Sequence, residues 1–81
     1  DQIELDIIII DGVLLICELK SSMSRSELHA FLRKARFYEK RHDRKANRLI
    51  VISPMIHPAA EKLAKEEGVE LYGDSEHVES I

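Results

Sequence analysis

DIIIIDGVLLICELK, residues 6–20, is the part of the sequence that decides the fold. It covers most of two apolar runs, residues 3–10 and 13–19, which are joined through Asp11-Gly12, a strong hairpin signal. Runs so rich in Ile, Leu and Val are typical of strands that are buried on both faces of a sheet. We therefore expect a β-hairpin whose two strands both lie in a buried sheet.

Three ionisable residues interrupt these apolar runs: Asp6, Glu18 and Lys20. An isolated charge inside such a sheet costs on the order of several kcal/mol unless it is paired or bound to a metal. We therefore take these three as the candidate functional residues. In the structural alternative, Glu18 and Lys20 form a pair on an exposed sheet edge and Asp6 caps a turn. The place of Asp6 between Leu5 and Ile7, within an apolar run, weakens that alternative.

The turn between the two strands decides whether the three charges meet. Side chains alternate along a strand, so Glu18 and Lys20 point to one face whatever the turn is. A plain two-residue turn would put Asp6 opposite Cys17 and direct it away from Glu18. A three-residue connection with a bulge at Gly12 would instead bring all three charges to one face. We predict the bulged or odd-length turn.

The rest of the chain predicts alternating helices and strands. We expect a helix, a strand, a second helix and a last strand over residues 24–42, 49–52, 58–67 and 69–72. Ser24 with Glu27 is a capping-box signal for the first helix, and Gly68 is a stop signal for the second. Because helical crossovers join parallel strands, we expect an α/β fold with one mixed sheet flanked by helices. Residues 1–73 would form this core, and residues 74–81 an acidic C-terminal tail.

The motif resembles the signature of a known enzyme family. Asp6 on one strand, followed by Glu18-Leu19-Lys20 on the next, is similar to the PD-(D/E)XK nuclease superfamily, with Ile-Glu-Leu-Asp in place of the Pro-Asp of the name. Residues 3–72 resemble uncharacterised archaeal members. The resemblance implies a restriction-endonuclease-like fold that here lacks the usual first helix and first strand. An open sheet edge of this kind invites pairing with a second copy, so a homodimer is expected.

The resemblance also implies an activity, that of a Mg²⁺- or Mn²⁺-dependent endonuclease that hydrolyses phosphodiester bonds of DNA. Asp6 and Glu18 would hold the ion through oxygen atoms, which hard cations prefer, and the backbone carbonyl of Leu19 would supply a further ligand. Lys20 would stabilise the attacking water or the phosphate. The rival interpretation is a catalytically inactive nuclease-fold module that binds nucleic acid or protein.

The charge of the chain is uneven, which its net charge of −3 does not reveal. Residues 20–48, the basic block, hold ten Lys and Arg against three Asp and Glu. Cations gathered on one side would track a phosphate backbone, and the candidate contacts are Arg25, Arg33, Lys34 and Arg36. The alternative is a solvated helix face that carries ion pairs. Because no aromatic residues alternate with the cations, contact to the backbone of double-stranded or branched DNA is favoured over base stacking.

Other chemistry has little support in the sequence. The four His and the single Cys show neither His-x-x-x-His nor Cys-x-x-Cys spacing, which argues against a zinc site. A lone cysteine excludes a disulfide within these 81 residues and suits a reducing cytosol, so a cytoplasmic location is expected. No apolar stretch is long enough to span a membrane, so no membrane partner is expected.

Overall fold

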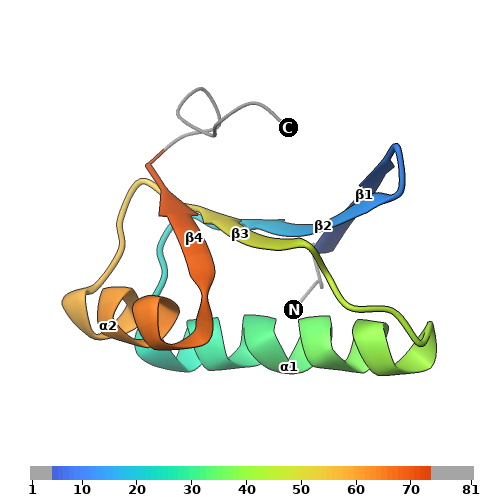
Figure 1. Ribbon diagram of the computed structural model, residues 1–81. Coiled ribbons are helices and arrows are strands. Elements are labelled where there is room, and N and C mark those ends of the chain that lie inside the picture. Colours follow the sequence, from blue (N-terminus) through green and yellow to red (C-terminus); the bar gives the residue numbers. More distant parts are fainter. Residues whose placement is uncertain (1–4, 74–81) are drawn as a thin grey trace.

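Residues 5–73 are described by a computed structural model, in which four strands form one mixed sheet (Figure 1). The strands lie side by side in chain order as β1 (Leu5–Ile10), β2 (Val13–Leu19), β3 (Arg48–Ile52) and β4 (Val69–Tyr72). β1 is antiparallel to β2, and the other neighbours are parallel. The connecting helices are α1 (Arg25–Arg41) and α2 (Pro58–Glu67). The expected α/β fold is confirmed, whereas the acidic tail predicted at residues 74–81 lies outside the described residues.

The ends of the helices follow their local sequence signals. The Ser24 hydroxyl accepts a hydrogen bond from the Glu27 N–H at 3.2 Å, and the Glu27 carboxylate accepts one from the Ser24 N–H at 2.9 Å. This reciprocal capping box satisfies two backbone donors at the start of α1. α2 begins at Pro58 and ends before Gly68, whose φ of 73° is the left-handed conformation that favours glycine. Both end signals read from the sequence are confirmed.

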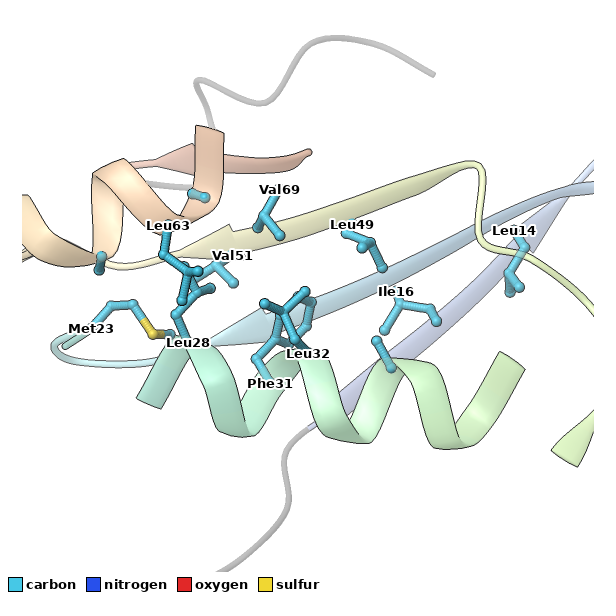
Figure 2. Packing of buried hydrophobic residues seen from close by; sticks show 13 residues of the cluster. Leu14, Ile16, Met23, Leu28, Phe31, Leu32, Leu49, Val51, Leu63 and Val69 are labelled. Carbon is cyan, nitrogen blue, oxygen red and sulfur yellow. The ribbon is translucent and has the colours of Figure 1, made fainter. Parts of the chain in front are cut away.

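Both helices cover the same face of the sheet, so the described part of the chain has two layers (Figure 1). The main core lies between these layers (Figure 2). The largest of its buried side chains are Leu14, Ile16, Met23, Leu28, Phe31, Leu32, Leu49, Val51, Leu63 and Val69. The buried residues of α1 recur every three or four positions, so one apolar stripe of this helix faces the sheet.

The opposite face of the sheet holds a smaller apolar cluster, built on Leu15, Cys17 and Ile50. The interior strand β2 is therefore buried on both faces, as expected. That expectation is wrong for β1, because it is the edge strand of the described sheet and its residues 8–10 are between 37% and 53% exposed. An open sheet edge is the feature on which the homodimer expectation rests. The homodimer stays a prediction.

The segments that follow β2 and β3 remain paired beyond the strands. The Lys20 N–H donates to the Ile52 carbonyl at 3.0 Å, and the Met23 N–H donates to the Met55 carbonyl at 2.8 Å. The Met23 carbonyl in turn accepts a hydrogen bond from the His57 N–H at 3.0 Å. These bonds hold the backbone at the position where Lys20 leaves the sheet.

Candidate functional site

Glu18 lies on β2, which has a neighbouring strand on each side. In the register of the sheet it pairs with Leu5 of β1 and with Val51 of β3. Because side chains alternate along a strand, Glu18 points to the same face as Ile16, the face that α1 covers. Glu18 is only 3% exposed, so its carboxylate is almost entirely removed from bulk water.

Lys34 of α1 supplies the charge that the buried Glu18 requires. Its ammonium donates a hydrogen bond to Glu18 Oε1 and forms an ion pair with it. Burial of a carboxylate with no partner carries a penalty of roughly several kcal/mol, which a close cation offsets. Lys34 was expected to contact nucleic acid, but its ammonium is directed into the domain, toward Glu18.

Lys20 lies two residues after Glu18 and also contacts α1. Its Nζ lies 3.2 Å from Glu27 Oε2, at the first turn of the helix, and this side chain is more than one third exposed. The pKa of Glu27 is held below its usual range, first by the hydrogen bond from the Ser24 backbone and then by the Ser24 hydroxyl and Lys20. Glu18 and Lys20 therefore share the α1 side of the sheet, as the spacing predicted.

Asp6 does not join them. The hairpin turn has two residues, Asp11 and Gly12, with φ of 50° and 80°, and the register pairs Asp6 with Cys17. Cys17 belongs to the cluster on the face opposite to Glu18. Burial raises the pKa of the Cys17 thiol, and the Asp6 carboxylate adds to this rise, as expected for two side chains on one face. The predicted bulged turn is therefore wrong, and the three charges do not converge in the described structure.

The observed register has a clear physical reason. Asp and Gly both tolerate the left-handed backbone that a tight hairpin turn requires, so Asp11-Gly12 needs no bulge. The register directs Leu5 and Ile7 toward the main core, against which both pack. A shift by one residue would exchange the two faces of β1 and bring Asp6 toward the core in place of its apolar neighbours. The sheet thus avoids a second buried carboxylate.

Cross-linking can test this register directly. Paired residues on antiparallel strands have Cα atoms about 4.5–5.5 Å apart, within the range of about 4.4–6.8 Å that a disulfide spans. We expect Asp6→Cys to form an intramolecular disulfide with Cys17 under a glutathione redox buffer. The measurement is the loss of both free thiols in a protein that remains monomeric by mass.

Ile7→Cys is the matched control for this experiment. In the observed register residue 7 pairs with Ile16 and faces away from Cys17, so its thiol should stay free. With the bulged turn, residue 7 would instead lie opposite Cys17. A disulfide in the Ile7→Cys variant and none in the Asp6→Cys variant would contradict the two-residue turn.

The described residues do not form a ligand set that fits a divalent metal ion. Three ligands were expected: the carboxylates of Asp6 and Glu18 and the carbonyl of Leu19. Asp6 lies on the opposite face, and the Glu18 carboxylate is already paired with Lys34. Within residues 5–73, no group of three or more His, Cys, Asp or Glu is close enough to hold a metal ion. Of the two carboxylates that were expected to hold the ion, only that of Glu18 lies on the same side of the sheet as Lys20.

The other cations expected to contact nucleic acid lie on the solvent side of α1. Arg25, Arg33 and Arg36 are all exposed. Arg36 donates to Glu39 Oε1 at 3.1 Å, whereas Arg25 and Arg33 take part in none of the ion pairs found among residues 5–73. The solvated-face alternative therefore holds for Arg36, and the other two guanidinium groups are available to a ligand.

A second ionic cluster, which was not predicted from the sequence, links β3 and β4. Arg48 Nε donates to Glu70 Oε2 at 2.7 Å, and the Tyr72 hydroxyl donates to Glu70 Oε1 at 2.7 Å. The hydrogen bond from Arg48 lowers the pKa of Glu70, while the bond to Glu70 raises the pKa of both Arg48 and Tyr72. The register pairs Ile50 with Glu70, so the side chains of Arg48, Glu70 and Tyr72 lie on one face of these parallel strands. The sequence shows the alternation along each strand but not the register between the two strands. The hydrogen bond to Glu70 holds the side chain of Arg48, the last cation of the basic block, against β4.

The sequence model of a protein family, the PD-(D/E)XK nuclease superfamily, matches residues 1–70 of the chain. The chain belongs to this superfamily. Glu18-Leu19-Lys20, at the end of β2, resembles the (D/E)XK part of the signature from which the superfamily takes its name, and Asp6 lies on the preceding strand. No curated protein and no solved structure matches the chain.

As a member of this superfamily, the chain is a nuclease-like domain with a restriction-endonuclease-like fold. Nucleases are the class of hydrolase that the resemblance implied. Members of the PD-(D/E)XK superfamily act on nucleic acids and typically use divalent metal ions. Among residues 5–73, neither helix has the length and apolar content needed to cross a lipid bilayer.

Proposed function

We propose that this PD-(D/E)XK domain hydrolyses phosphodiester bonds of DNA as an endonuclease, with Glu18 and Lys20 as the core of its site. One observation carries the proposal: an intact Glu-x-Lys motif ends an interior strand of a chain that matches the superfamily over residues 1–70. Both side chains lie on the side of the sheet that is covered by α1, a helix of the basic block. This neighbourhood favours a polyanionic substrate.

The two residues have separate roles in this proposal. The Lys20 ammonium is accessible at the end of β2 and would offset the negative charge that develops on the phosphate oxygens during hydrolysis. Glu18 would accept a proton from, or orient, the attacking water, and for this its carboxylate must be released from Lys34. Asp6 would join the site only if β1 shifted by one residue against β2, which would place it opposite Glu18.

The cofactor of the proposal is Mg²⁺ or Mn²⁺, the kind of ion that the superfamily uses. The observed register does not bring Asp6, Glu18 and the Leu19 carbonyl together around one ion. The dependence of cleavage on the ion is therefore a part of the proposal that has to be measured. If DNA cleavage survives exhaustive treatment of the protein with EDTA, the metal ion is removed from the proposal.

A second candidate, a nuclease-fold module that binds DNA without cutting it, is favoured by a different observation. Glu18 and Lys20 each already have an ion-pair partner on α1, namely Lys34 and Glu27. Such paired charges stabilise the fold and need no substrate. The two candidates therefore differ in cleavage and agree in DNA binding.

Plasmid cleavage separates the two candidates. We expect the wild-type protein to nick or linearise supercoiled plasmid in Mn²⁺, and Glu18→Gln and Lys20→Ala each to lower the rate at least about 100-fold, the scale typical of a lost acid–base group. Glu18→Gln keeps an oxygen that Lys34 can bond to, which limits damage to the fold. The measurement is the rate of plasmid conversion on agarose gels, with folding checked by circular dichroism.

Glu66→Gln and Lys62→Ala are the matched controls, because they remove one exposed carboxylate and one exposed ammonium from α2. Both should cut at the wild-type rate. Binding of plasmid without cutting, in either metal ion, contradicts the enzyme and supports the module. Cutting that falls equally in the control variants would show that Glu18 and Lys20 have no special role.

A further inference from the structure

Phe37 is an exposed aromatic side chain in the middle of a cationic helix face. It is 65% exposed, although α1 buries Phe31 completely six residues earlier. A single exposed apolar residue is common on protein surfaces and needs no explanation of its own. The surroundings of Phe37 are what point to a ligand, because this helix is the most basic part of the described chain.

Phe37 lines a hollow between α1 and the start of β1, which we call the α1 hollow. Its volume is about 320 Å³, at the small end of ligand sites, which are typically roughly 300–1,000 Å³. The lining residues are Leu5, Arg33, Lys34, Phe37, Tyr38 and Arg41. The hollow thus combines two aromatic rings and a leucine with three cations.

Two of the three cations in the α1 hollow are available to a ligand. Arg33 and Arg41 take part in none of the ion pairs found among residues 5–73, whereas Lys34 is paired with Glu18. Lys34 also connects the hollow to the candidate site. Leu5, another lining residue, is the register partner of Glu18 on β1. The α1 hollow therefore lies next to the buried carboxylate of the candidate site.

A ligand that fits this hollow needs a flat apolar part and at least one negative charge. A nucleotide has both: its base stacks on aromatic rings, and its phosphates pair with guanidinium groups. In a continuous duplex, the face of a base is covered by its stacked neighbours and cannot reach Phe37. An unpaired nucleotide, in contrast, presents its base face to such a residue.

We propose that the α1 hollow binds an unpaired nucleotide of a DNA strand, with its base stacked on Phe37 and its phosphates at Arg33 and Arg41. The proposal rests on the proposed function and narrows it. Of double-stranded and branched DNA, it selects branched or otherwise partly single-stranded DNA as the substrate class. A continuous duplex can reach the guanidinium groups but leaves Phe37 unused.

Two strands of equal length and charge test the proposal. Fluorescein-labelled oligothymidylate carries bases, whereas an abasic strand of the same length carries only the sugar-phosphate backbone. Binding is measured by fluorescence anisotropy in EDTA, so that no cleavage occurs. We expect Phe37→Ala to weaken binding of oligothymidylate at least about fivefold, the lower end for a lost stacking contact, and to leave the abasic strand unchanged.

Three further variants define the contact. Phe37→Trp should keep or strengthen binding of oligothymidylate, because it retains a stacking surface. Arg33→Ala should weaken both strands alike, because phosphate contacts do not depend on the base. Met55→Ala is the control for loss of a large exposed apolar side chain, because Met55 is 61% exposed and lies on the segment after β3. It should change the binding of neither strand.

Equal losses for the two strands in Phe37→Ala would overturn the proposal, because they would show that the side chain does not contact a base. Wild-type protein that binds neither strand would also overturn it. These results are separable from a failure of the proposed function. If the wild-type protein cuts plasmid and Phe37→Ala binds oligothymidylate as tightly as the wild type does, only the stacking site is contradicted. If Phe37→Ala weakens binding of oligothymidylate as expected but the wild-type protein never cuts plasmid, only the enzymatic activity is contradicted.

Discussion

We expect Phe31→Ala to remove a large part of the stability of the domain. Phe31 is fully buried in the main core, where it lies between α1 and the sheet (Figure 2). Truncation of a buried phenylalanine lowers the free energy of unfolding by about 3–5 kcal/mol, because apolar contacts are lost and a cavity remains. Small domains have a total stability of only about 5–15 kcal/mol. The measurement is urea unfolding followed by circular dichroism.

Phe37→Ala is the matched control, because it removes the same side chain from the same helix. Phe37 is 65% exposed, so its truncation should change the free energy of unfolding by no more than about 0.5 kcal/mol, as at most surface positions. Equal destabilisation by the two variants would contradict the placement of α1 on the sheet. The same Phe37→Ala protein serves the DNA-binding experiment, where a stable fold is required.

The second large effect concerns the ion pair between Glu18 and Lys34. We expect Lys34→Met to lower the free energy of unfolding by about 2–3 kcal/mol, because the Glu18 carboxylate remains buried with no cation beside it. A fully buried pair would lose about 3–5 kcal/mol, but the Lys34 side chain is 26% exposed, and water reduces the cost. Thermal unfolding at neutral pH measures this loss.

Two controls isolate the buried charge as the cause. Arg36→Met removes an exposed ion pair with Glu39 on the same helix, and it should cost no more than about 0.5 kcal/mol. The double variant Glu18→Leu with Lys34→Met should recover most of the lost stability, because replacing both partners by apolar groups leaves no unpaired charge. A double variant no more stable than Lys34→Met would contradict this explanation.

Most of the fold could be predicted because its signals are local. The capping box at Ser24, Pro58 at the start of α2 and Gly68 at its end each act within one turn of a helix, and each was found where expected. The parallel arrangement of β2, β3 and β4 followed from the helices between them. The exposure of β1 was missed, since an Ile-rich run in the sequence does not reveal whether a strand has one neighbour or two.

The candidate site was predicted less completely, because it depends on contacts between distant residues. The Glu18-x-Lys20 spacing placed both side chains on one face, since alternation along a strand is independent of the turn. The partner of Glu18 is Lys34, sixteen positions away on a helix, and no local pattern identifies it. Phe37 was not recognised as an aromatic residue on a cationic face, although its basic neighbours are visible in the sequence.

The amino-acid pattern alone was enough to establish an α/β domain, the order of its elements and the motif of a nuclease superfamily, because capping, periodicity and motif spacing act over a few residues. Three-dimensional packing was needed to place Asp6. A two-residue and a three-residue turn are both compatible with Asp11-Gly12, and the choice between them is made by Leu5 and Ile7, which pack against the main core. Burying these two side chains turns Asp6 to the face opposite Glu18, since a strand cannot direct neighbouring residues to the same side.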